Sequence, residues 1–134
     1  TGVQLEVGQN PTEFEREPLE RTLLKCRRYF TKKETGVGFG ALGVGGHIIG
    51  GTTANVLVPL PVEMRSQGTL TSGGSLRVTA PNADTVTVAL AYGSTHIPQL
   101  TATDSGGFTD GGGSGVALMG NNDDDAFIAF DAEL

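Results

Sequence analysis

The stretch "DTVTVALAYG", residues 84–93, decides the fold class. Val86, Val88 and Leu90 alternate with threonine and alanine, a period typical of a strand with one face against a core. The segments "SLRVTAP" (residues 75–81) and "DAFIAFDAEL" (125–134) share its content of β-branched and aromatic residues. A fourth segment, "TANVLVPLPVEMR" (53–65), begins as a strand and then contains two prolines, which restrict it to an edge or a bend. These segments predict an all-β domain.

The composition of the chain fits this prediction. Its 134 residues suffice for one domain with a core, while the hydrophobic fraction is only 37% and the glycines number 21. Such a profile is typical of an all-β protein with short strands and many turns. Turn-rich loops are expected at "TDSGGFTDGGGSG" (103–115) and "GNNDDD" (120–125). The glycine-rich segment 35–51 predicts either a mobile loop or a strand with a bare face that another backbone approaches closely.

The first 30 residues predict a strand followed by a helix. "GVQLEV" (2–7) alternates between apolar and polar residues, and prolines at 11 and 18 interrupt regular structure after it. A short helix is expected from Pro18, with Pro18 at its first position and Glu20 in its first turn. Because "CRRYFT" (26–31) also alternates, a strand beginning at Cys26 is the alternative, and Cys26 itself is interpreted as a core residue. The apolar stripe of the helix would consist of Leu19, Leu23, Cys26 and Phe30.

Charge is divided unevenly along the chain. Residues 1–34 contain seven Lys/Arg and six Asp/Glu, whereas residues 35–134 contain two basic residues against nine acidic ones. The net charge of −6 argues against nucleic acid as a partner, and no basic amphipathic helix favours membrane insertion. The single cysteine excludes an internal disulfide, so packing or partners must supply stability in a reducing cell. No run of 18 apolar residues and no signal peptide is found, and the start at Thr1 favours a fragment or a processed product.

Motifs for catalysis or metal binding are weak. "GFGALG" (38–43) matches a dinucleotide fingerprint, but helix breakers follow where that fingerprint needs a helix. "GNNDDDAF" (120–127) offers oxygen ligands for calcium, with a solvated turn as the alternative. His47 and His96 are isolated in the sequence, and His47 is interpreted as an ordinary strand residue. Asp104, Asp110 and Asp123 could pair as glycosidase carboxylates, but any acidic loop offers such pairs, so we predict no catalytic residue. We also predict no cofactor and no metal.

Glycan binding by this chain would depend more on hydrogen bonds than on ring stacking. There is no Trp and there are only two Tyr, so Asp, Asn, Ser and Thr side chains would supply most contacts. Phe108, within "GGFTDGG" (106–112), is either displayed at a loop tip or folded back over the core. The candidate receptor-binding residues are Tyr92, His96, Asp104, Phe108, Asp110, Asn121 and Asn122.

Five pieces of the sequence, in this order, resemble a known family. They are "QLEVG" (4–8), "FE" (14–15), "CRRYF" (26–30), "PVEMR" (61–65) and the terminal "IAFDAEL" (128–134). Their ordered combination resembles the C-terminal domain of tailed-bacteriophage tail fibre proteins. The pieces frame the whole chain, while segments 36–47 and 95–125 match nothing in the family pattern.

The resemblance implies a virion protein at the tip of a tail fibre, made in the host cytoplasm. We therefore expect a jelly-roll-like β-sandwich with one short N-terminal helix, assembled as a homotrimer in which segment 36–46 is a candidate subunit contact. Residues 1–17 would be a strand and connector from the preceding fibre region, and residues 18–134 the tip domain. The expected function is binding of a host surface polysaccharide or lipopolysaccharide. The alternatives are a depolymerase or esterase, and a purely structural trimerisation cap.

Overall fold

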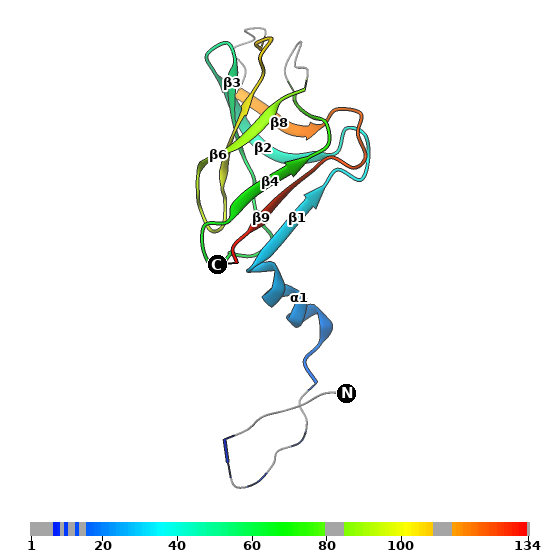
Figure 1. Cartoon of the computed structure of the whole chain (residues 1–134), viewed down its shortest axis with the longest axis vertical. Helices are drawn as coiled ribbons and strands as arrows, with labels where there is room; N and C mark the ends of the chain where they lie inside the picture. Colours follow the sequence, from blue (N-terminus) through cyan, green and yellow to red (C-terminus); the bar gives the residue numbers. More distant parts are fainter. Residues whose placement is uncertain are drawn as a thin grey trace.

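Two antiparallel β-sheets pack face to face and form the body of the protein (Figure 1). The computed structural model describes residues 7–8, 10, 13, 16–79, 85–108 and 114–133. The smaller sheet has the order β1-β9-β4, with the respective bounds Phe30–Glu34, Phe127–Asp131 and Thr69–Gly73. The larger sheet has the order β5-β8-β2-β3-β7-β6, with bounds Leu76–Val78, Ser114–Gly120, Ala41–Ile49, Thr53–Leu57, Gln99–Thr103 and Thr87–Tyr92. The all-β sandwich predicted from the sequence is confirmed.

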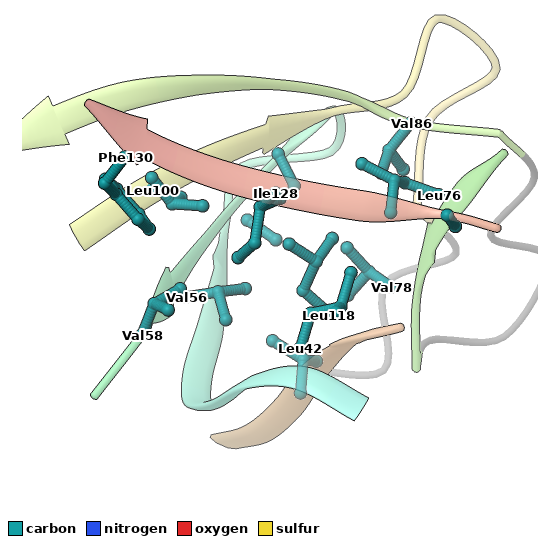
Figure 2. Packing of buried hydrophobic residues seen from close by; sticks show 14 of the residues in the cluster. Leu42, Val56, Val58, Leu76, Val78, Val86, Leu100, Leu118, Ile128 and Phe130 are labelled. Atoms are coloured by element: carbon teal, nitrogen blue, oxygen red, sulfur yellow. The ribbon is translucent and has the colours of Figure 1, made fainter. Parts of the chain in front are cut away.

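The core lies between the two sheets (Figure 2). The side chains of Ile128 and Phe130 in β9 project from the inner face of the smaller sheet, and the two residues are 0% and 1% exposed. Leu42, Val56 and Leu118 of the larger sheet point towards them and are equally inaccessible. Since burial of one such side chain stabilises a fold by about 1.5–3 kcal/mol, this interleaved cluster holds the sheets together.

Most strands follow the predicted pattern. The segments at 53–65, 75–81, 84–93 and 125–134 contain β3, β5, β6 and β9. The two prolines at 59 and 61 lie beyond the end of β3, so β3 itself is a central strand and the bend follows it. The pattern misses β4, β7 and β8, because serine, threonine and glycine occupy many of their positions. The strand expected at residues 2–7 lies outside the described residues except for its last position.

The predicted helix is present as α1 (Leu19–Arg27) and lies outside the sandwich, where β1 begins (Figure 1). Pro18 precedes it with ψ at 140°, so the helix begins one residue later than expected. None of its residues is buried: Leu19 is 72% exposed and Leu23 is 46% exposed. The interpretation of Cys26 as a core residue is wrong, because α1 extends past the sheets and its thiol is exposed.

The glycine-rich segment allows a close approach of strands within the chain. A Cβ on Gly46 would lie 2.2 Å from the backbone oxygen of Asn55 in β3 and 2.8 Å from Cγ2 of Val116 in β8. Only a glycine fits between these neighbours, which explains the bare strand face. Val37 and Phe39, in the turn before β2, are 62% and 54% exposed.

Three distant pieces of sequence meet where α1 joins the sheets. The backbone oxygen of Arg28 accepts the N–H of Arg65 at 2.8 Å, and that of Tyr29 accepts the N–H of Ala132 at 2.7 Å. The Arg65 guanidinium also lies 5.7 Å from the centre of the Tyr29 ring. We call these four residues the helix–sandwich junction.

Candidate functional site

The predicted receptor-binding residues do not form one site. Two of them lie at the β6–β7 connection, two follow the far end of β7, and two follow β8. Asp110 lies outside the described residues. The three described pairs are Tyr92 with His96, Asp104 with Phe108, and Asn121 with Asn122.

Phe108 and Asp104 are structural. Phe108 is folded back over the core, 4% exposed, and its backbone N–H donates to the oxygen of Gly51 at 2.6 Å. Asp104 is also 4% exposed, and its Oδ1 accepts the N–H of Gly106 at 2.9 Å. Both residues fix the chain after β7 against the turn between β2 and β3. So little of either residue reaches the surface that a structural role explains both, and as receptor contacts they stay predictions.

The loop after β8 is held by hydrogen bonds to Ser75, between β4 and β5, and by one within the loop itself. The N–H of Asn121 donates to the oxygen of Ser75 at 2.8 Å, and Asn122 adopts a left-handed φ of 51°. The Asp123 carboxylate accepts the N–H of Ser75 at 2.6 Å and that of Asp125 at 2.9 Å, and these bonds lower the pKa of Asp123. Within the described ranges, no three His, Cys, Asp or Glu side chains are grouped so as to hold a metal ion. Asn121 and Asn122 stay predictions as receptor contacts.

Tyr92 and His96 are the predicted residues that face solvent on the larger sheet and its adjoining connection. Tyr92 ends β6, is 73% exposed and pairs with Gln99 of β7. His96 is exposed in the following connection, where its backbone oxygen accepts the N–H of Leu60 at 3.0 Å. The ring of Tyr92 is therefore open to a ligand.

The face of the larger sheet that points away from the core, here the outer face, carries two ordered rows of side chains. In antiparallel strands, directly paired residues project to the same side with their Cβ atoms about 5 Å apart. β2, β3, β7 and β6 contribute one residue each to every row. The first row is Val44, Leu57, Gln99 and Tyr92, and the second is His47, Asn55, Thr101 and Ala89.

A shallow pocket of about 210 Å³ lies between these rows. Its walls include His47, Asn55, Leu57 and Gln99. Gly45 leaves the space open: it sits at the irregularity of β2 between Val44 and His47, with a φ of 69° and no atom within 4 Å of where a Cβ would stand. A bulge at a glycine thus creates the pocket.

The pocket is chemically suited to hydroxyl groups. The Thr101 hydroxyl donates to Oδ1 of Asn55 at 3.4 Å. The side-chain nitrogen of Asn55 therefore points away from Thr101 and is a donor for a ligand. His47 and Gln99 add further donors and acceptors, and Leu57 and Tyr92 supply apolar surface at the border. None of the described residues that line the pocket is acidic, so it lacks the two carboxylates that glycoside hydrolysis normally uses. The arrangement suits binding of a ligand rich in hydroxyl groups.

Sequence reasoning placed His47 correctly in a strand but did not identify the pocket. Asn55 and Gln99 were missed because β7 was not predicted, so nothing placed the two residues side by side. Their signal is the alternation in "TANVL" and "QLTAT", which puts both residues on the outward face.

Comparison with protein-family models, with curated proteins and with solved structures gave no match. No helix in the described part of the chain is long and apolar enough to cross a membrane.

Proposed function

We propose that the protein is the receptor-binding tip of a tailed-phage tail fibre and that it binds a host surface polysaccharide or lipopolysaccharide without cleaving it. The proposed assembly is a homotrimer of jelly-roll-like sandwiches in the virion. The outer-face pocket carries the proposal, because hydrogen-bonding side chains beside the exposed Tyr92 ring suit a saccharide. One shallow pocket binds weakly, and three copies per fibre would raise the avidity.

The helix–sandwich junction supports the family resemblance on which the phage assignment depends. "CRRYF", "PVEMR" and "IAFDAEL" are far apart in the sequence, yet Arg28, Tyr29, Arg65 and Ala132 bring them into direct contact. Motifs that build one structural element have a physical reason to occur together. The element they build is where a fibre shaft would enter the tip.

The exposed stripe of α1 supports self-association, because isolated helices of nine residues are marginal in water. We expect Leu19→Gln with Leu23→Gln to convert a trimer into the 13.8 kDa monomer in light scattering. The sandwich should keep its stability, because neither side chain is buried. Lys25→Gln, a polar change on the same helix, is the control and should leave the mass unchanged. A wild-type monomer, or a double variant that stays trimeric, would contradict this role of α1.

We expect Tyr92→Ala to weaken staining of host cells by the fluorescently labelled protein by about tenfold, because stacking on an aromatic ring is worth about 1 kcal/mol per site and is multiplied by avidity. Tyr92→Phe keeps the ring and should retain most of the staining. Enzymatic removal of the surface polysaccharide should abolish it. Equal staining by the alanine and phenylalanine variants would exclude Tyr92 from the receptor site.

Experiments on the same host cells distinguish receptor binding from the two alternative functions, an enzyme and a structural cap. Release of reducing ends or acetate from the envelope would identify a depolymerase or esterase. A trimer that stains no host cell would identify a structural cap.

A further inference from the structure

A second and larger pocket, of about 490 Å³, lies along β1 next to the end of α1. Its lining includes Arg27, Lys32 and Lys33, together with Phe30, Thr31 and Leu60. None of the described lining residues is acidic, although the whole chain has a net charge of −6. The volume falls in the range of about 300–1,000 Å³ that is usual for small ligands. We call it the basic pocket.

Two cations of the basic pocket have no acidic partner in the described part of the chain. Lys33 is partly buried, and its ammonium donates to the backbone oxygens of Leu42 at 3.1 Å and Pro59 at 3.3 Å. Burial lowers the pKa of Lys33, which shows that the charged form is poorly solvated there. Arg27, at the end of α1, forms no ion pair with a described residue. A bound anion would give both cations a partner.

The backbone of β1, whose residues line the pocket, also has polar groups at the edge of the sheet that no described strand pairs. Ala132 donates to Tyr29 and Thr35 donates to Ala126, so the odd-numbered positions of β1 point to β9. In an antiparallel pair the alternate residues point the other way, so the N–H and C=O groups of Phe30 and Lys32 both face the open edge, and only the N–H groups suit an anion. β1 is an edge strand, and no other strand among the described residues covers this side.

Lys32 differs from the other two cations. Its ammonium forms an ion pair with Glu34 and lies 4.3 Å from the centre of the Phe127 ring. Glu34 is the one acid that this part of β1 contributes, and Lys32 already neutralises it. The charge available to a ligand therefore comes from Arg27 and Lys33.

We infer that the basic pocket binds a single anionic group, carboxylate or phosphate, carried by a saccharide. Arg27 and Lys33 compensate the charge, the edge N–H groups of β1 donate to the anion's oxygens, and Phe30 and Leu60 offer apolar surface to the sugar carbons. The preference for an anion rests on this pocket alone. The saccharide rests on the proposed function and makes it more specific, since it assigns an acidic sugar to the receptor.

Isothermal titration calorimetry at low ionic strength tests the pocket, with glucose 6-phosphate, glucuronate, inorganic phosphate and glucose as ligands. We expect the two charged sugars to bind, phosphate to compete with them, and neutral glucose to bind at least tenfold more weakly. Arg27→Gln and Lys33→Met should each weaken binding of the charged sugars about tenfold. If Lys33→Met folds poorly because its hydrogen bonds are lost, Arg27→Gln alone tests the pocket. Lys25→Met removes the same charge from an exposed helix position outside the pocket and should bind like the wild type.

Three results would overturn the inference: no heat with either charged sugar, equal binding of glucose, or the same loss in Lys25→Met as in Arg27→Gln. Staining of host cells separates this inference from the proposed function. Weaker staining by Arg27→Gln, with Tyr92→Phe still staining, supports an acidic receptor. Full staining by Arg27→Gln would exclude the basic pocket from the receptor site and leave the outer face as the binding surface. A wild-type protein that binds charged sugars but stains no cell would contradict the proposed function instead.

Discussion

Gly46→Ala should lower the free energy of unfolding by about 3 kcal/mol or more, one of the largest effects of any single substitution in this chain. The added Cβ would stand 2.2 Å from the backbone oxygen of Asn55 and 2.8 Å from Val116, so β2 would have to move away from β3 and β8. Backbone atoms of a central strand cannot relax as a flexible side chain can. The measurement is denaturant unfolding at one fixed protein concentration, because self-association shifts apparent stability.

Gly51→Ala is the matched control for this substitution. No atom lies within 4 Å of a Cβ at Gly51, and its backbone is not in the left-handed region. We expect a change within about 0.5 kcal/mol. A Gly46 variant as stable as the Gly51 variant would show that the strands do not approach as closely as the structure places them.

Phe108→Ala should destabilise the protein by about 3–5 kcal/mol and leave receptor binding by the folded fraction unchanged. The ring is 4% exposed and belongs to the core cluster, so its removal leaves a cavity. Tyr92→Ala is the matched aromatic control: with 73% of the residue exposed, it should change stability by no more than about 0.5 kcal/mol while weakening staining.

We therefore expect opposite results for the two variants: Phe108→Ala lowers the thermal stability and keeps cell staining, and Tyr92→Ala keeps the stability and loses staining. Each staining value is divided by the amount of folded protein in the sample. Loss of staining by a stable Phe108 variant would return the β7–β8 connection to the receptor site.

The sequence predicts the fold well wherever β-branched and aromatic residues alternate. β3, β5, β6 and β9 carry this signal directly. In β7, "QLTAT", the two inward residues Leu100 and Ala102 alternate with threonines. The contrast in hydrophobicity is small, so this alternation alone does not identify a strand. Pro18 and Glu20 predict the start of the helix to within one residue, but the predicted stripe runs on to Phe30, which lies in β1. The exposure of the stripe is not predicted either, because a stripe gives no information about what covers it.

The candidate site could not be read from the sequence for a different reason. Loop composition drew attention to Phe108 and Asp104, whose burial depends on the turn at Gly51 some 50 residues earlier. The pocket on the outer face requires the register that brings His47, Asn55 and Gln99 together. Register is a property of strand pairing, and no local pattern in any one of these strands specifies it.

The helix–sandwich junction also decides how the protein would respond to mechanical load. The chain enters the sandwich at Phe30, and β1 pairs with β9 through five consecutive residue positions running back from that entry. Tension applied through α1 would reach the sheet at the first residue of β1, where the helix and the strand meet at a bend (Figure 1). Inter-strand hydrogen bonds of an antiparallel pair lie across the strand axis, so the part of the load that acts along β1 would strain all of them together. If the proposed function is correct, this pairing is what would resist unfolding of the domain while the sandwich is held by its receptor and α1 is pulled.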